Sequence, residues 1–164
     1  MDSVEIRSIM KCDPEVPFRG VYAADKIPRI VSKTSAMVFN TDPAHKAGKH
    51  WVAVYFKDGR GHYFDSYGRR PPPDFASFMT RNSHKWTWNK KCMQSFGSNV
   101  CGHYCLYFLH EMSRGKQPRF PSQGTDKFVA SAVKRFYGDQ KEYKRRVAGG
   151  GCNQCCKKRR RKRT

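Results

Sequence analysis

Acidic residues and long apolar runs are both scarce in this sequence. Only 13 of the 164 residues are Asp or Glu, against 33 Lys or Arg, which gives a formal net charge of +20. No apolar run reaches the roughly 18 residues that a membrane-spanning helix needs, so we expect no membrane span. Residues 1–5 lack a basic stretch followed by an apolar one, so we expect no secretory signal either.

The cysteines also lack a pattern typical of secreted proteins. There are seven of them, an odd number, and their spacing does not suggest a disulfide framework. We therefore expect an intracellular, mostly reduced protein. The length and a hydrophobic content of 38%, with 11 Phe, 8 Tyr and 3 Trp, are sufficient for the core of one domain.

Half of the net positive charge lies near the C-terminal end of the sequence. Residues 141–164 contain eleven basic residues and one acidic residue, and residues 1–140 carry the other +10. A basic body with a basic tail predicts binding to a polyanion, most simply to nucleic-acid phosphates with release of counterions. The alternative is that the charge serves solubility alone.

A candidate nucleophile lies in residues 94–105, QSFGSNVCGHYC. The loop at residues 97–99, followed by apolar residues, predicts a helix with Ser98 or Asn99 as its N-cap. Cys101 then lies in the first turn, where unpaired N–H groups and the helix dipole favour a thiolate. Gln94 is placed to direct its side-chain NH₂ at a developing oxyanion, together with the N–H of Cys101.

Two strands upstream supply a candidate base and an orienting group. Residues 50–56 and 62–67 are rich in β-branched and aromatic residues, and residues 57–61 have the composition of a hairpin turn. His50 begins the first strand and Asp65 lies near the end of the second. These ends are adjacent in an antiparallel pair, so we predict a triad of His50, Asp65 and Cys101.

Two other cysteines compete with Cys101 for the role of nucleophile. Cys105 lies one helical turn later and is expected to point into the core. Cys92 lies in a strand-to-loop turn just before Gln94. Cys101 also has Gly102 beside it, which we expect to let a substrate approach closely.

These motifs resemble those of the adenovirus-type cysteine proteases (adenain), whose fold is shared with the SUMO- and ubiquitin-like-specific proteases. The resemblance covers about residues 1–114. The matching pieces are His50–Trp51, Tyr63–Phe64–Asp65 closed by Gly68, Gln94 with a six-residue gap to Cys101–Gly102, and Phe108–Leu109–His110.

The resemblance implies an α+β fold with a mixed central sheet, the Cys101 helix on one face and further helices around it. It implies a monomeric viral maturation endopeptidase that cleaves precursor structural proteins at Gly-containing sites. We expect no metal and no cofactor for the chemistry, but association with DNA and a location in the host nucleus and the virion. The alternatives are a protease that deconjugates a ubiquitin-like modifier, and a non-catalytic basic protein that binds or packages DNA.

The sequence beyond residue 146 is read as a tail. We predict a protease domain at residues 1–146, then a glycine hinge and a Cys-rich basic segment at residues 147–164, of disordered composition. The basic run, which includes Arg159, Arg160 and Arg161, resembles a nuclear localisation signal. Cys152, Cys155 and Cys156 could bind a metal, but a fourth ligand is not evident.

The family offers another interpretation of this tail. Adenain is activated by a short basic peptide that forms a disulfide with the enzyme, and its cleavage sites resemble an aliphatic residue, any residue, Gly-Gly and then the cut. Residues 147–150, VAGG, approximate such a site. The tail, through Cys152 and Arg159–Arg161, is therefore a candidate activator. This chain has no cysteine at the family's spacing, and Cys92 is the nearest.

The remaining segments complete the expected fold. We predict an amphipathic helix at residues 2–11 with Val4 inward, mostly loop at residues 12–34, and a strand at residues 35–40. Asp74 opens a second helix, residues 84–89 form a strand, and Thr125 caps a last helix with Phe128 on its apolar face. Trp86 and Trp88 in the predicted strand are read as packing residues, with stacking on nucleic-acid bases as the alternative.

Overall fold

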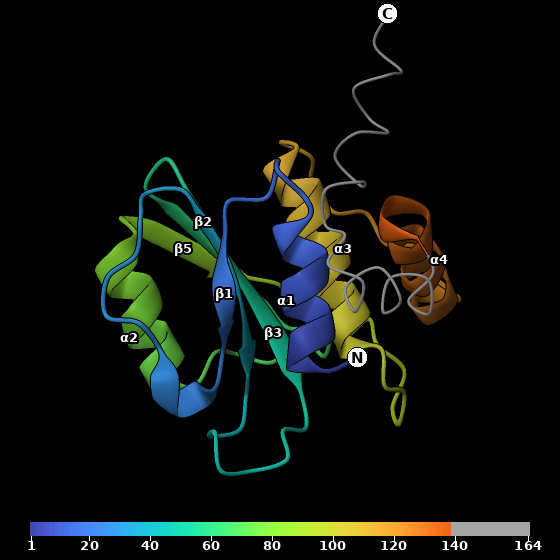
Figure 1. The fold of residues 1–164 in the computed structure, drawn as a ribbon, viewed down its shortest axis with the longest axis horizontal. Helices are drawn as coiled ribbons and strands as arrows, with labels where there is room; N and C mark the ends of the chain where they lie inside the picture. Colours follow the sequence, from blue (N-terminus) through green and yellow to red (C-terminus); the bar gives the residue numbers. More distant parts are fainter. Residues whose placement is uncertain (139–164) are drawn as a thin grey trace, which may run out of the picture.

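A computed structural model describes residues 1–138, which form a five-stranded mixed sheet with helices on both faces (Figure 1). The spatial order follows the chain, from β1 to β5; both outer pairs are parallel and both inner pairs antiparallel. The strands are β1 (Phe18–Tyr22), β2 (Ser35–Asn40), β3 (Trp51–Lys57), β4 (Arg60–Phe64) and β5 (Lys85–Trp88). The helices are α1 (Ser3–Lys11), α2 (Pro73–Asn82), α3 (Cys101–Ser113) and α4 (Thr125–Tyr137), with a short 3-10 helix at Ala24–Lys26.

The hairpin of β3 and β4 forms as predicted. Its turn places Asp58 and Gly59 at φ values of 51° and 72°, the left-handed conformation that Asp-Gly turns adopt readily. The antiparallel register runs from Lys57 opposite Arg60 to Ala53 opposite Phe64. The start of β3 and the end of β4 therefore lie at the same edge of the sheet.

Helix α3 forms the centre of one hydrophobic core. Almost all of its side chains are buried, because α3 packs on the sheet at β3 and is flanked by α1 and α4 (Figure 1). On the other face α2 packs Phe75 and Phe78 against Phe39 and Phe56 in edge-to-face contacts. The predicted α+β fold, with a mixed sheet and the Cys101 helix on one face, is confirmed.

Helix α1 begins where the sequence indicates. Asp2 is its N-cap, and a capping box joins the Asp2 carboxylate to the N–H of Glu5 and the Glu5 carboxylate to the N–H of Asp2. The inward orientation predicted for Val4 is wrong, because its side chain is 64% exposed. Ile6, Ile9 and Met10 form the buried face instead.

The prediction that residues 12–34 are mostly loop missed strand β1. Pro17 and Gly20 give this segment the composition of a loop. Its backbone nevertheless pairs in parallel with β2, with Val21 opposite Val38, and the register shifts between Phe18 and Gly20. A short irregular edge strand depends on its partner strand rather than on a local pattern.

Two helix starts differ from the sequence-based predictions. Helix α2 begins at Pro73, one residue before Asp74, since proline is favoured in the first turn of a helix. Helix α4 has Gly124 as its N-cap, and the Thr125 hydroxyl donates to the Pro121 carbonyl instead. Phe128 is partly exposed rather than part of the buried face of α4.

Within residues 1–138, no helix combines the length and the apolar character needed to cross a membrane. The same residues contain no cluster of three or more His, Cys, Asp or Glu side chains that could hold a metal ion.

Candidate active site

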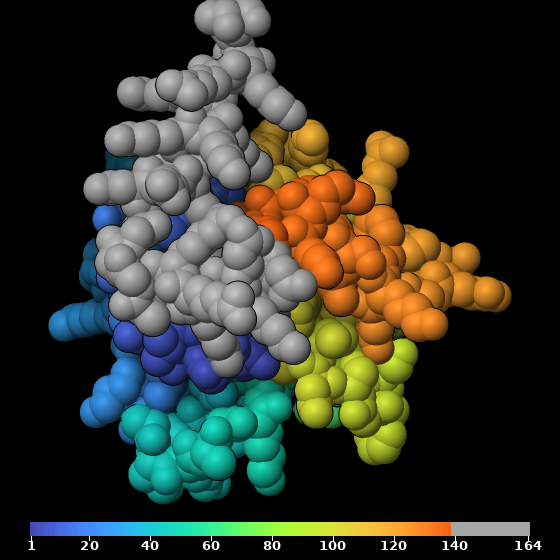
Figure 2. All heavy atoms as spheres, turned by 45° about the vertical axis from the view of Figure 1, so that its right-hand side comes forward, coloured from blue at the N-terminus to red at the C-terminus, as the bar shows by residue number. Residues whose placement is uncertain are grey.

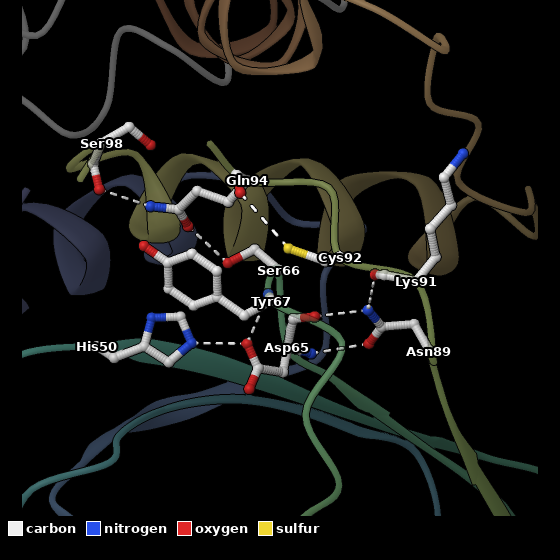
Figure 3. A network of polar contacts seen from close by, with 9 residues as sticks. All are labelled: His50, Asp65, Ser66, Tyr67, Asn89, Lys91, Cys92, Gln94 and Ser98. Atoms are coloured by element: carbon white, nitrogen blue, oxygen red, sulfur yellow. Dashed lines mark hydrogen bonds and ion pairs between the residues drawn. The ribbon is translucent and has the colours of Figure 1, made fainter. Parts of the chain in front are cut away.

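His50 and Asp65 meet at the sheet edge where β3 begins and β4 ends. The Nε2 atom of His50 lies 2.7 Å from Oδ1 of Asp65, and both residues are buried (Figure 3). The same Oδ1 atom accepts a 2.8 Å hydrogen bond from the backbone N–H of Tyr67. Two donors thus fix this carboxylate oxygen, and Nε2 of His50 is engaged, which leaves Nδ1 for a second partner.

Cys101 is the first residue of α3 and is the second partner of His50. The N-cap is Val100, which makes no side-chain cap, so the predicted capping by Ser98 or Asn99 is wrong. The placement of Cys101 in the first turn is right. Its sulfur is hydrogen-bonded to the His50 side chain and to the backbone N–H groups of Trp51 and Gly102.

This arrangement favours a thiolate and an imidazolium. Burial alone would raise the pKa of Cys101, but the hydrogen bonds from His50 and the two N–H groups, with the nearby positive charge, lower it below its usual value. Burial likewise opposes a charged His50. The hydrogen bonds to Asp65 and Cys101 and their negative charges outweigh it and raise the pKa of His50 to about 9.

The Gln94 side chain is held in one orientation by two serines. The Ser66 hydroxyl donates to Oε1 of Gln94 at 2.6 Å, and Nε2 of Gln94 donates to the Ser98 carbonyl at 2.7 Å (Figure 3). A carbonyl oxygen can only accept, so Nε2 must be the atom that faces Ser98. Nε2 carries a second hydrogen. In the predicted oxyanion role of Gln94, this hydrogen would be donated to the oxyanion.

The loop that carries Gln94 is anchored to α4. The Asp126 carboxylate lies 2.8 Å from the Tyr104 hydroxyl and accepts from the backbone N–H of Ser95 at 3.3 Å. The Tyr104 hydroxyl is also 2.9 Å from the carbonyl oxygen of Met93. No pattern in the sequence indicates these contacts, because Asp126 lies 32 residues after Gln94 and follows no motif.

Tyr67 is a further site residue that the sequence did not indicate. Its ring lies 5.0 Å from the His50 ring, centroid to centroid, and the Arg69 guanidinium lies 5.0 Å from the Tyr67 ring centroid. Figure 3 shows the Tyr67 ring between His50 and the Gln94 side chain. An aromatic residue two positions after a candidate aspartate is not a pattern that indicates a site residue.

Comparison with known proteins gives a relative in sequence and a neighbour in fold. A protein of Acanthamoeba polyphaga mimivirus named "Putative thiol protease R355" is 33% identical over 93 residues, which cover 49% of this chain and 30% of that protein. The SUMO protease Ulp1 superposes with a TM-score of 0.53 at 13% identity, covering 85% of this chain and 79% of its own. The chain has the fold of the SUMO-protease-like (clan CE) cysteine proteases.

The ASFV pS273R protease is also similar to this chain, with a TM-score of 0.47 and 26% identity over 59% of this chain and 43% of that one. No family model matches the chain. The chain accounts for less than a third of the length of the mimivirus relative and less than half of the ASFV protease.

The two competing cysteines occupy different surroundings in this clan CE fold. Cys105 is fully buried, as expected, and burial raises the pKa of its thiol well above the usual value, so it is not a reactive group. Cys92 is exposed and free, and its sulfur lies 3.6 Å from the Gln94 carbonyl oxygen. Its predicted role in a disulfide with an activator stays a prediction.

Gly102 has a packing role in the clan CE fold, and the close approach of substrate predicted for it stays a prediction. A Cβ atom at this position would lie 3.2 Å from the Met1 side chain and 3.5 Å from Ile6. The glycine therefore faces α1. Gly68 closes the turn after Asp65 at a φ of 69°, and a Cβ there would lie 2.7 Å from the Lys91 backbone.

The tail residues Cys152, Arg159, Arg160 and Arg161 lie outside the described residues. The predicted domain boundary at residue 146 and the VAGG segment lie outside them too. These predictions stay as they were made from the sequence.

Ser66→Ala tests the orientation of Gln94. We expect kcat to fall by a factor of about 3 to 10, because the carboxamide loses one of its two anchors while keeping the other. The measurement is peptide hydrolysis at saturating substrate. Ser83→Ala is the matched control, because that hydroxyl also donates one internal bond, to the Met79 carbonyl, far from the site. Equal losses in both variants would contradict an orienting role.

Proposed function

We propose that this chain is a thiol endopeptidase with Cys101 as nucleophile, His50 as general base and Asp65 as the group that orients His50. The observation that carries the proposal is the 2.7 Å hydrogen bond between the Asp65 carboxylate and His50, with Cys101 at the start of α3 near enough that the thiol and the His50 ring shift each other's pKa. This is the arrangement of nucleophile, base and orienting group that acyl transfer requires.

In the proposed reaction the Cys101 thiolate attacks the scissile carbonyl carbon, and the carbonyl oxygen becomes an oxyanion. The N–H of Cys101 and Nε2 of Gln94 stabilise that charge. The C–N bond breaks as His50 gives its proton to the leaving amine, which leaves a thioester on Cys101. His50 then takes a proton from water, the hydroxide attacks the thioester, and the carboxylic acid product and the thiolate are released.

We propose glycine-containing sites in viral precursor structural proteins as substrates. Cys101 is only 9% exposed and His50 only 7%, which supports substrates with little bulk beside the scissile bond. The half-buried Tyr67 ring lies beside the His50 ring and narrows the same region. The mimivirus relative, named as a thiol protease, supports a viral enzyme.

Phe96 supports a further substrate contact. It lies on the loop between Gln94 and Cys101 and is 101% exposed, which is unusual for a side chain of its size. We expect Phe96→Ala to raise KM for a long peptide or protein substrate about tenfold with kcat unchanged, from the loss of one apolar contact. Ile30→Ala, another exposed hydrophobic, is the control. Equal kinetics in both variants would rule out the contact.

Association with nucleic acid is proposed from the charge and from an aromatic surface. The Arg70 guanidinium and the Lys90 ammonium lie 5.8 and 5.2 Å from the Trp88 ring centroid, and Trp86 lies 6.0 Å from Trp88. Aromatic rings with neighbouring cations suit single-stranded bases and phosphates. A location in the host nucleus and the virion is proposed on the same grounds.

We propose that DNA, and a basic Cys-containing peptide such as the chain's own tail, raise activity, with cleavage after Gly150 as one route to release the peptide. The exposed thiol of Cys92, beside Gln94, is a position from which a disulfide would reach the oxyanion loop.

The test is hydrolysis of a fluorogenic peptide ending in Leu-x-Gly-Gly, with and without duplex DNA, at low and high salt. Turnover of the peptide supports an endopeptidase, and a stimulation by DNA that salt removes supports a role for the charge. Processing of only a folded ubiquitin-like precursor would replace the proposal with a deconjugating protease. Salt-sensitive DNA binding with no turnover of either substrate would replace it with a non-catalytic binding protein.

A further inference from the structure

The Asn89 side chain bridges both backbone polar groups of Asp65. Its Oδ1 atom accepts from the N–H of Asp65 at 2.8 Å, and its Nδ2 atom donates to the carbonyl oxygen of Asp65 at 2.5 Å (Figure 3). Nδ2 also lies 3.3 Å from the Lys91 carbonyl oxygen. Every polar atom of this carboxamide is therefore engaged, and two of its three bonds go to one residue.

The bridge stands at the point where the sheet ends. The parallel ladder between β4 and β5 has Tyr63 opposite Trp88 as its last pair. Asn89 follows β5, and Asp65 follows Phe64 at the end of β4. Beyond the last backbone pair, the Asn89 side chain therefore supplies the hydrogen bonds to Asp65.

Close packing does not replace these bonds. A pocket of about 220 Å³ lies beside Asn89, between the ends of β4 and β5 and the second half of α3. Its walls include Phe64, Trp88 and Phe108, but none of His50, Asp65 or Cys101. Asn89 lines this pocket, so one side of its side chain has no close-packed neighbour and its carboxamide is held by hydrogen bonds. Asp65 itself is buried, and its carbonyl oxygen also accepts from the N–H of Gly68 at 2.8 Å.

We propose that Asn89 is the positioning residue that holds Asp65 against His50. This inference rests on the proposed thiol-protease function. Asn89 touches none of the reacting atoms; it fixes the backbone from which the Asp65 carboxylate reaches Nε2 of His50. A carboxylate that swings away from His50 loses both its orienting and its charge-stabilising effect on the imidazolium.

Asn82 provides a matched control within the same chain. Its Oδ1 atom accepts from the N–H of Val31 at 2.9 Å, and its Nδ2 atom donates to the carbonyls of Arg29 and Phe78 at 3.1 and 2.9 Å. It is the same residue type with the same number of bonds to backbone, at the end of α2. A purely structural role for Asn89 would make the two alanine variants behave alike.

The first measurement compares Asn89→Ala and Asn82→Ala in the full chain by peptide hydrolysis across pH. We expect Asn89→Ala to lower kcat about 10- to 100-fold with little change in KM, and to move the alkaline limb of the pH profile to lower pH by about one unit. Asn82→Ala should lose thermal stability but keep kcat and the pH profile. The same limb position in both variants would overturn the proposal.

A second measurement does not need peptide turnover. The rate at which iodoacetamide alkylates Cys101, followed on the peptide containing that residue by mass spectrometry, depends on the protonation of Cys101 and His50. We expect the upper inflection of its pH dependence to move down in Asn89→Ala and to stay in place in Asn82→Ala. If the chain hydrolyses no peptide, the proposed function is wrong. The alkylation comparison still decides whether Asn89 positions Asp65.

Asn89→Asp is the variant for the case in which alanine prevents folding. The added carboxylate would itself raise the pKa of His50, so the neutral variant Asn89→Leu, which has nearly the same shape and makes none of the three bonds, is measured beside it. We expect Asn89→Leu to show the same downward shift of the upper inflection as Asn89→Ala. A wild-type inflection in a folded Asn89→Leu protein would contradict the proposal.

Discussion

Cys101→Ala is expected to lower kcat/KM for a Gly-Gly peptide by a factor on the order of 10⁴ or more, since the loss of a nucleophile leaves only the binding and oxyanion contributions. Cys101 is the described cysteine whose sulfur is hydrogen-bonded to His50 and to two backbone N–H groups. The measurement is hydrolysis of the fluorogenic peptide under the condition that gives the wild-type chain its highest rate.

Cys105→Ala is the control for this experiment. Cys105 lies one turn along the same helix and is fully buried, so its replacement removes a small apolar contact without touching the site. We expect a loss of about 1 kcal/mol in the free energy of unfolding and a kcat within a factor of three of wild type. Substantial hydrolysis by Cys101→Ala, or an equal loss in Cys105→Ala, would show that Cys101 is not the nucleophile.

The central part of the fold could be predicted because its signals are local. The alternating and aromatic residues of β3 and β4, with an Asp-Gly turn between them, fix an antiparallel hairpin. That pairing brings residue 50 and residue 65 to one edge without any knowledge of the rest of the chain. The apolar run after Cys101 likewise fixed α3, although its N-cap residue was not predicted.

What could not be predicted depends on contacts between distant segments. Strand β1 is a strand because β2 pairs with it, and its own residues look like loop. The anchors around the site are single polar residues in unremarkable positions: Asn89 after a strand, Ser66 beside a candidate aspartate, and Asp126 in a late helix. A polar side chain that bonds to backbone leaves no periodicity in the sequence, so its partner is known only from the folded structure.

Asp65→Asn is expected to have the second-largest effect, a loss of kcat/KM by a factor of about 10³ to 10⁴. The amide has the same shape and can still accept from the N–H of Tyr67, but it carries no negative charge. Hydrogen bonding to the Asp65 carboxylate and its charge are among the causes that hold the pKa of His50 at about 9. Without that charge the imidazolium is less stable, and the alkaline limb of the pH–rate profile should move well below 9.

The same substitution has a consequence for stability whose sign follows from the direction of the pKa shift. A folded-state pKa of about 9 for His50, above its value of about 6.5 in the unfolded chain, stabilises the fold fully below pH 6.5, and this stabilisation is lost as pH rises through 9. Asp65→Asn should therefore lower the melting temperature more at pH 6 than at pH 9.5. Asp25→Asn is the control, because Asp25 accepts one backbone bond, from Ala44 at 2.8 Å, far from His50. A loss of stability in Asp65→Asn that is the same at both pH values would mean that the Asp65 charge does not stabilise a protonated His50, and the thiolate–imidazolium pair would then lack its support.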